Sequence, residues 1–354
     1  MNNEQNMTQN SNQTTQAAAE QTAAEQAAVE QKLAKKKLTR RIFIGGGLGA
    51  LAVVGGGAGW AYNRYLAEHT EIEDTTAYEA AAAQANASAS GSATASPSEL
   101  TGVKIDGQSL TANEGSITIT STTTGSGSDA VVSFVADIKL DNATLLRSAF
   151  ANNKFGQNII DTPSNIASEH NGIWAINGDY YGFRTTGIVI RNGVVYRDSG
   201  AREGLAFYRD GSVKIYDETS TNGQKLVKQG VWNTLSFGPS LVKNGKIVDG
   251  IDDVEIDTNF GNHSIQGNQP RTLVGAKKDG TLVFVVVDGR DAGYSRGVTM
   301  TEAAKIMLEQ GCVTAYNLDG GGSSTMYFNG EVINEPSNGG ERGTSDILYV
   351  EKLS

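Results

Sequence analysis

The sequence predicts an α+β domain with a mixed sheet, many β-hairpins and few helices, preceded by one N-terminal transmembrane or signal helix. Three observations lead to this fold class. Glycine is abundant and proline scarce, at 43 and 5 residues in a chain of 354, which favours a turn-rich β architecture. Short β-type runs alternate with turn signals in the C-terminal part of the chain. One uncharged run near the N-terminus is about long enough to cross a bilayer.

The N-terminal part predicts a tail and a membrane segment. Residues 1–41 are expected to be a disordered cytoplasmic tail, because residues 1–31 are rich in polar residues and alanine and contain little that could form a core. The basic end of this tail leads into the uncharged run IFIGGGLGALAVVGGGAGWA, residues 42–61. Basic residues flank the cytoplasmic side of such segments, so the rest of the chain is expected to lie outside the cytoplasm as part of a single-pass membrane protein.

The same segment has a second interpretation as a cleaved export signal. The stretch TRRIFIG, residues 39–45, resembles a twin-arginine signal, and a small-x-small cleavage site is present at residues 59–61. We favour the retained anchor. The many glycines of residues 42–61 argue against a third interpretation, a buried helix of a soluble domain, because glycine weakens helices in water. Both interpretations place the bulk of the chain across the membrane.

A flexible linker and one folded domain are expected after this segment. Residues 62–100 end in small residues typical of a solvated linker, and the domain should span residues 101–354. Inside it, hairpin-like runs occur at residues 116–123, 130–140, 187–197, 205–217, 240–248 and 325–333. Two-residue turn signals are Asn192-Gly193, Asp210-Gly211, Asn244-Gly245 and Asn329-Gly330.

The clearest helix is predicted at residues 299–311. Thr299 and Glu302 form a capping-box pair, and Gly311 is a natural stop. Its apolar face is expected to comprise Met300, Ala303, Ala304, Met307 and Leu308.

Two acids follow the buried strands that flank this helix. TLVFVVVDGR, residues 281–290, ends in Asp288-Gly289-Arg290, and CVTAYNL, residues 312–318, is followed by Asp319. A strand, helix and strand in this order predict a βαβ unit whose strands are parallel and close in one sheet. Asp288 and Asp319 should then lie at the same sheet edge, where ligands bind in open α/β sheets.

The loop after Asp319, GGGSST, has several possible roles on these residues alone. A Walker phosphate loop needs a lysine that is absent, and a nucleophile elbow needs a further glycine. The chain has only three histidines, none in a setting that suggests a serine hydrolase base. A ligand-binding glycine turn and a plain strand connection remain open.

Composition excludes some functions. The formal net charge of -10 argues against a nucleic-acid binder. The single cysteine, Cys312, rules out an internal disulfide and a cysteine-based zinc cluster. An oxygen-rich set of side chains would suit Ca²⁺ or Mg²⁺, but no ligand spacing establishes a metal, and the sequence requires no cofactor.

Four blocks in order resemble the phosphodiester glycosidase family. They are AINGDYYG (175–182), FGPSLVKNGK (237–246), QPRTLVGAKKDGTLVFVVVDGR (269–290), and NLDGGGSSTM followed by GEVINEPSNGGERGTSDILYV (317–350). The resemblance covers about residues 170–350. It implies hydrolysis of a sugar-1-phosphodiester at the anomeric bond, which gives free sugar and a phosphomonoester. Because the domain is expected to lie outside the cytoplasm on an anchor, a phosphate-linked envelope glycan or exopolysaccharide is the expected substrate.

This resemblance suggests roles for charged residues. Asp319 is the first candidate for the catalytic carboxylate, as nucleophile or general base, and Asp288 is the second. Asp288 alternatively orients an arginine through a salt bridge or binds a metal. The leaving phosphate needs cationic clamping, for which Arg271 is the first candidate, followed by Arg290 and Arg342.

The other expected substrate contacts are hydrogen bonds to the sugar and phosphate. They come from Asn177, Asp179, Asn317, Gly320, Gly321, Gly322, Ser323, Ser324 and Thr325, with Glu341 as a reserve acid. Tyr180 and Tyr181 are expected either to stack on the sugar or to pack in the core. The alternative functions are a non-catalytic polysaccharide-binding module and an exopolysaccharide assembly protein with the same fold.

Overall fold

The computed structural model describes residues 66–90, 100–256, 265–337 and 339–352. The predicted tail (1–41) and the predicted membrane segment (42–61) lie outside these residues. Within the described ranges, none of the helices has the length and apolar character needed to span a membrane.

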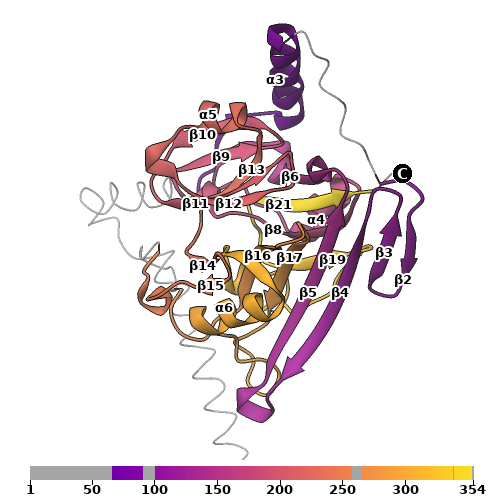
Figure 1. The fold of residues 1–354 in the computed structure, drawn as a ribbon, viewed down its shortest axis with the longest axis vertical. Helices are drawn as coiled ribbons and strands as arrows, with labels where there is room; N and C mark the ends of the chain where they lie inside the picture. The colour runs from indigo at the N-terminus through magenta and orange to yellow at the C-terminus, as the bar shows by residue number, and fades with distance from the viewer. Residues whose placement is uncertain (1–65, 91–99, 257–264, 338, 353–354) are drawn as a thin grey trace, which may run out of the picture. The chain divides into compact units, whose positions relative to one another are not determined.

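The largest element is a nine-stranded sheet in which each neighbouring pair is antiparallel (Figure 1). Its strands, in spatial order, are β15 (Lys246–Ile247), β14 (Ser240–Lys243), β18 (Cys312–Asn317), β16 (Arg271–Lys277), β17 (Leu282–Val287), β5 (Val131–Leu140), β4 (Gly115–Thr124), β3 (Ser109–Ala112) and β2 (Lys104–Asp106). Every residue of the central strand β17 is buried, as its uninterrupted apolar run predicts.

A second, five-stranded sheet packs on one face of the first and forms the main core with it. Its strands, in spatial order, are β20 (Glu331–Val332), β19 (Met326–Phe328), β8 (Gly172–Asn177), β21 (Asp346–Glu351) and β6 (Leu146–Phe150). Trp174 and Phe284 meet across this core with ring centroids 4.7 Å apart. The helix α6 (Met300–Glu309) packs on the opposite face of the large sheet, and α4 (Pro163–Glu169) packs on the five-stranded sheet.

Smaller sheets complete the described domain. They are the three-stranded sheet β12 (Val213–Asp217), β11 (Glu203–Tyr208) and β13 (Val231–Leu235), the pair β10 (Val194–Ser199) and β9 (Gly187–Arg191), and the pair β1 (His69–Ile72) and β7 (Phe155–Gln157). A short helix, α5 (Gly223–Lys228), packs on β10 and β9. The predicted α+β class with many hairpins and few helices is therefore confirmed for the part of the chain that is described. The expectation of a mixed sheet is wrong for these residues, because hydrogen-bonded neighbouring strands are antiparallel in each sheet.

All four predicted two-residue turns close hairpins. They join β9 to β10, β11 to β12, β14 to β15, and β19 to β20, each as an antiparallel pair. Asn192, Asn244 and Asn329 have φ values of 51°, 51° and 50°. Asparagine followed by glycine tolerates this left-handed backbone, which is why the local sequence sufficed to locate the turns.

The predicted strand–helix–strand unit comprises β17, α6 and β18. β17 and β18 each pair antiparallel with β16, which lies between them, so they are parallel to each other. Asp288 and Asp319 consequently follow the carboxyl ends of two parallel strands at the same edge of the sheet, as predicted.

The capping box of α6 is confirmed in both directions. The Thr299 hydroxyl accepts from the N–H of Glu302 at 3.2 Å, and the Glu302 carboxylate accepts from the N–H of Thr299 at 2.9 Å. One part of the predicted apolar face is wrong: Leu308 is 38% exposed, whereas Met307 is fully buried. The packed face of the helix is narrower than the sequence pattern suggests.

The expectation of a flexible linker at residues 62–100 is wrong for the described residues 69–72 and 75–90. β1 pairs with β7, and residues Thr75–Ser90 form the helix α3 (Figure 1). The Asp74 carboxylate accepts from the N–H of Ala77 at 2.9 Å, and the Glu79 carboxylate accepts from the Tyr196 hydroxyl at 3.0 Å. The run of alanines favours a helix because alanine has the highest helix propensity, and this local preference outweighs the linker-like composition of the segment.

Candidate active site

The loop after β18 places Asp319 beside a tightly packed glycine turn, η7 (Gly321–Ser323). A Cβ on Gly320 would lie 2.7 Å from the carbonyl oxygen of Pro270, which excludes a side chain there. The N–H of Gly321 donates to the same carbonyl at 2.9 Å. The N–H group of Gly321, predicted to contact phosphate, is therefore held by the protein.

The Asp319 carboxylate accepts hydrogen bonds at the surface end of this loop. The Ser323 hydroxyl donates to Oδ2 of Asp319 at 2.7 Å, and Nη2 of Arg342 lies 3.4 Å from the same oxygen. The Asp319 side chain is 13% exposed and that of Arg342 is 47% exposed. Burial raises the pKa of Asp319 above its ordinary value, while the charge of Arg342 acts in the opposite direction.

A second exposed arginine, Arg290, lies next to the glycine turn. Its Nη2 is 3.0 Å from the position that a Cβ of Gly321 would take, and the left-handed backbone of Gly321, with a φ of 61°, favours glycine there. Nε and Nη2 donate to Oε1 of Gln269 at 2.9 and 2.7 Å. Burial and the nearby charge of Arg342 both lower the pKa of Arg290. The structure thus brings two predicted phosphate-binding arginines together beside Asp319.

A third arginine, Arg184, also acts on Asp319 and was missed by the sequence analysis. Its positive charge lowers the pKa of Asp319. Its guanidinium carbon lies 5.3 Å from the ring centroid of Tyr180 and 4.8 Å from that of Phe237. Arg184 follows the AINGDYYG block by two positions, which was the one available signal. Tyr180 is half-buried beside it, whereas Tyr181 is fully buried in the core.

Asn177, predicted to bind sugar, ties three segments of the chain together. Its Nδ2 donates to the backbone oxygen of Asp319 at 2.8 Å. Its Oδ1 accepts from the hydroxyl of Thr272 at 2.8 Å and from the N–H of Thr325 at 3.2 Å. Asn177 is fully buried, so the amide fixes the backbone of Asp319 from beneath.

The other polar residues of the loop are also buried. Asn317 donates from Nδ2 to the backbone oxygen of Gly238 at 2.8 Å. Gly322, Ser324 and Thr325 are buried. Among the described residues, Oγ of Ser324 and Oγ1 of Thr325 have no hydrogen-bond partner. Their predicted contacts with substrate stay predictions.

Asp179 belongs to a buried charge cluster behind the loop. Its Oδ2 accepts from the N–H of Ser236 at 2.6 Å and lies 3.9 Å from Nη2 of Arg191. Nε of Arg191 donates to Oδ2 of Asp346 at 2.7 Å, and Oδ1 of Asp346 accepts from the N–H of Asp179 at 2.8 Å. Burial raises the pKa of Asp346 to about 6, although Arg191 opposes this shift. The Asp179 side chain is only 1% exposed.

Asp288, the second predicted carboxylate, holds two loops in place. Its oxygens accept from the Tyr294 hydroxyl at 2.9 Å, from Nδ2 of Asn334 at 2.8 Å and from the N–H of Glu335 at 2.9 Å. Nδ2 of Asn334 also donates to the backbone oxygen of Ser324 at 3.0 Å. Burial raises the pKa of Asp288, and these hydrogen bonds act against that shift. The observed partners are therefore neutral donors rather than an arginine.

Arg271, the first candidate for the phosphate clamp, is buried, and its guanidinium donates to backbone oxygens. Its Nε donates to the backbone oxygen of Val298 at 3.0 Å, and its Nη2 donates to those of Ile265 and Gly267 at 2.5 and 2.8 Å. Burial lowers the pKa of Arg271 to about 10. The charge of Arg290 acts on the pKa of Arg271 in the same direction, so the two arginines lie near each other, while the hydrogen bonds of Arg271 go to backbone oxygens.

Glu341, the reserve acid, caps the start of α4. Its carboxylate accepts from the N–H of Ser164 at 2.9 Å and from the hydroxyl of the same serine. No group of three or more His, Cys, Asp or Glu side chains that could hold a metal occurs within the described ranges.

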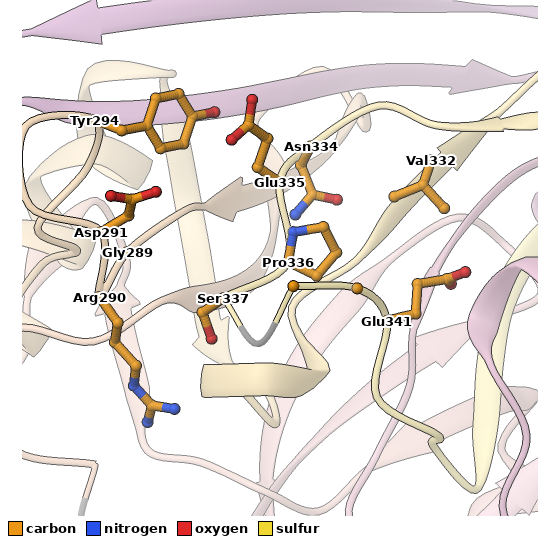
Figure 2. Close-up of a pocket in the computed structure, with 12 residues that line it drawn as sticks. Gly289, Arg290, Asp291, Tyr294, Val332, Asn334, Glu335, Pro336, Ser337 and Glu341 are labelled. Carbon is orange, nitrogen blue, oxygen red and sulfur yellow. The ribbon is translucent and has the colours of Figure 1, made fainter. Parts of the chain in front are cut away.

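A cavity of about 560 Å³ opens beside Arg290. It is lined by the loop that follows β17, including Tyr294, and by the loop that follows β20, including Asn334 and Glu335 (Figure 2). We call it the Tyr294 pocket. Its volume is in the usual range for small-molecule sites, and Arg290 connects it to the glycine turn and Asp319.

Comparison with known proteins identifies relatives of this domain. The sequence profile described as phosphodiester glycosidase matches residues 170–351, slightly more than half of the chain. The SPbeta prophage-derived uncharacterized protein YomE of Bacillus subtilis is 34% identical over 205 residues, covering 55% of this chain and 30% of YomE. The N-acetylglucosamine-1-phosphodiester alpha-N-acetylglucosaminidase of Mus musculus is 29% identical over 181 residues, covering 46% of this chain and 33% of the enzyme. The chain thus spans about a third of the length of these curated relatives.

Solved structures share the fold. The zebrafish N-acetylglucosamine-1-phosphodiester alpha-N-acetylglucosaminidase catalytic domain, auto-inhibited by its pro-peptide, has a TM-score of 0.54 at 22% identity, covering 72% of this chain and 87% of that chain. A hypothetical protein from Synechocystis has a TM-score of 0.51 at 14% identity, covering 66% and 61%. The profile match includes the blocks that carry AINGDYYG and NLDGGGSSTM. On this match, the chain belongs to the phosphodiester glycosidase family.

Proposed function

We propose that this protein hydrolyses the anomeric bond of a sugar-1-phosphodiester at Asp319. One observation carries the proposal: a partly exposed carboxylate lies beside two exposed arginines, Arg342 and Arg290. Among the three predicted aspartates, Asp319 has a side chain that is 13% exposed, while the side chain of Asp179 is 1% exposed and residue Asp288 is 1% exposed. The family membership supports the reaction class, because the mouse relative bears the name of such an enzyme.

The chemistry needs an anionic group at the sugar and cations at the phosphate. Asp319 acts on the anomeric carbon, either directly as nucleophile or by taking a proton from water. The bond between the anomeric carbon and the phosphate oxygen breaks, and its electron pair leaves with the phosphomonoester. Arg342 and Arg290 stabilise that leaving anion through charge-assisted hydrogen bonds. Arg184, which follows the AINGDYYG block, adds a third positive charge that acts on Asp319.

The direct test is an assay of the purified full-length chain against a panel of sugar-1-phosphodiesters. We expect one or more substrates to release reducing sugar and a phosphomonoester in equal amounts. Release of sugar phosphate instead would show cleavage of the other ester bond and contradict the proposal. Tight polysaccharide binding without turnover on any substrate would favour the non-catalytic binding module.

The arginines give a second prediction. Arg342→Gln should raise KM about tenfold or more, because a charge-assisted contact with phosphate is lost. Arg342 also lowers the pKa of Asp319, so its removal should leave that pKa higher. If Asp319 acts as the ionised group, the acid limb of kcat/KM moves to higher pH.

The matched control is Lys305→Gln, which removes a positive charge from an exposed position of α6. This control should keep the wild-type KM and pH profile. Equal effects of both variants would point to a general change in net charge. A shift of the basic limb in Arg342→Gln would instead assign Asp319 the role of a general acid.

We further propose that the enzyme works outside the cytoplasm, held by residues 42–61, on phosphate-linked glycans of the envelope or exopolysaccharide. The uncharged run with its basic flank supports this proposal. Cell fractionation with external protease treatment tests it. A retained anchor predicts a membrane-bound chain that is cleaved from outside, and a processed signal predicts a shorter soluble exported chain. A full-length cytosolic protein contradicts both.

A further inference from the structure

The Tyr294 pocket has two ends of opposite charge. Arg290 forms one end and extends away from the carboxylates of Asp291 and Glu335, which lie at the other end with the Tyr294 hydroxyl (Figure 2). Burial raises the pKa of Tyr294, and the negative charges of Asp288, Glu335 and Asp291 act in the same direction. The carboxylates of Asp291 and Glu335 therefore lie close enough to the Tyr294 hydroxyl to act on it, as their shared place in the pocket lining indicates.

The acidic end is built into the fold. Asp288 accepts from the N–H of Glu335 at 2.9 Å and from the Tyr294 hydroxyl at 2.9 Å, so one buried carboxylate holds both walls. Through Nδ2 of Asn334, the same carboxylate is linked to the backbone oxygen of Ser324 in the loop after Asp319. The hydrogen bonds of Asp288 therefore connect the walls of the pocket to the proposed catalytic loop and hold the two at a fixed distance.

We propose that the Tyr294 pocket receives the alcohol esterified to the far side of the phosphate, and that Asp291 and Glu335 make it prefer a positively charged, amine-bearing alcohol. This inference rests on the proposed function. With the anomeric carbon at Asp319 and the phosphate at Arg342 and Arg290, the second ester oxygen lies beyond the phosphate. The cavity that opens beside Arg290 is the space available there.

Charge decides the preference within this space. Arg290 is held by Gln269 and serves the phosphate. The carboxylate of Glu341, which also lines the cavity, is engaged by Ser164. Asp291 and Glu335 are exposed residues at the end of the pocket opposite Arg290. Their carboxylates would face the esterified alcohol. They attract an ammonium group and repel a carboxylate, and the ring of Tyr294 offers an ammonium group an additional contact.

For each sugar 1-phosphate of the panel above, the test uses three esters that differ only in the charge of the alcohol: aminoethyl, hydroxyethyl and carboxymethyl. For the wild-type full-length chain, we expect kcat/KM to fall in that order, by about tenfold from first to last. In the double variant Asp291→Asn/Glu335→Gln, the three values should converge to within about twofold. The matched control, Glu331→Gln, removes an exposed carboxylate of β20 outside the pocket and should keep the wild-type order.

Binding of the corresponding phosphomonoesters by calorimetry separates this inference from the proposed function. Turnover of all three esters at equal efficiency would overturn the pocket assignment and leave the hydrolase proposal standing. No turnover, with aminoethyl phosphate bound more tightly than the carboxymethyl compound in wild type but not in the double variant, would support the pocket and contradict the hydrolase. A wild-type preference that survives in the double variant overturns the role of the two carboxylates. Neither turnover nor binding overturns both proposals.

Discussion

Replacing Asp319 with asparagine is expected to lower kcat by about 10²- to 10⁴-fold while the protein stays folded. Asparagine keeps the size of the side chain and an oxygen that can accept from the Ser323 hydroxyl, but it cannot act as nucleophile or base. The measurement is turnover of the best phosphodiester together with thermal unfolding. The control Asp106→Asn, at an exposed position of β2, should keep full activity.

Stability gives this experiment a second readout. The pKa of Asp319 is raised in the folded state, so its protonated form contributes to the stability of the fold. This stabilising contribution is fully present at pH values below the pKa of the unfolded state, and it is lost as the pH rises through the pKa of the folded state. At neutral pH the ionised carboxylate therefore lowers the stability of the folded state. Replacement by the neutral asparagine removes this destabilising charge. We expect an unchanged or higher Tm, as is common when a functional group is removed. Full activity in Asp319→Asn would remove this residue from its assigned role.

Arg191→Met is expected to lower the free energy of unfolding by about 3–5 kcal/mol. The Arg191 side chain is fully buried, and its guanidinium is the charge partner of Asp346 and Asp179. Without it, two buried carboxylates lose their compensating charge in a region that already raises the pKa of Asp346 to about 6. Urea unfolding followed by fluorescence measures the change.

The controls for Arg191→Met separate charge burial from a general loss of a long side chain. Lys243→Met breaks an ion pair with Glu203 whose side chains are 42% and 35% exposed, and it should change stability by less than about 1 kcal/mol. The double variant Arg191→Met/Asp346→Asn should recover part of the loss, because one unpaired carboxylate is neutralised. A single variant as stable as the wild type would show that the cluster does not stabilise the loop that carries Asp179.

The activity data should also depend on this cluster in a specific way. Asp346 fixes the N–H of Asp179, and the segment that contains Asp179 also contains Asn177, which holds the backbone of Asp319. A destabilised cluster would therefore reduce activity through the position of Asp319. Its effect should diminish at low temperature, where the variant is folded, whereas the effect of Asp319→Asn should not.

Much of the local structure could be predicted from the sequence because short-range rules decide it. Asparagine–glycine pairs fix the hairpin turns through the left-handed backbone at Asn192, Asn244 and Asn329. The capping box starts α6 at the predicted residue. Apolar runs of strand length with a helix between them were enough to place Asp288 and Asp319 at one sheet edge.

The candidate site was less predictable, because side-chain partners come from distant segments. Asn177 and Asp319 are 142 positions apart, yet the amide of the first holds the backbone of the second. Arg271 lies at the sheet edge where the site was predicted, but its guanidinium donates to the backbone carbonyl oxygens of Ile265 and Val298. Arg184, whose charge acts on Asp319, lies just beyond a block in which only residues 177 and 179–181 were site candidates.

The sequence by itself determined where the strands, turns and main helix lie, and the four blocks indicated the family. Only the tertiary structure decided which polar residues face solvent. It left Asp319, Arg290 and Arg342 at the surface end of the glycine loop and buried Asn177 and Asp288 as braces. The physical reason is that backbone conformation follows from neighbouring residues, whereas burial and charge partners exist only after distant strands have packed together.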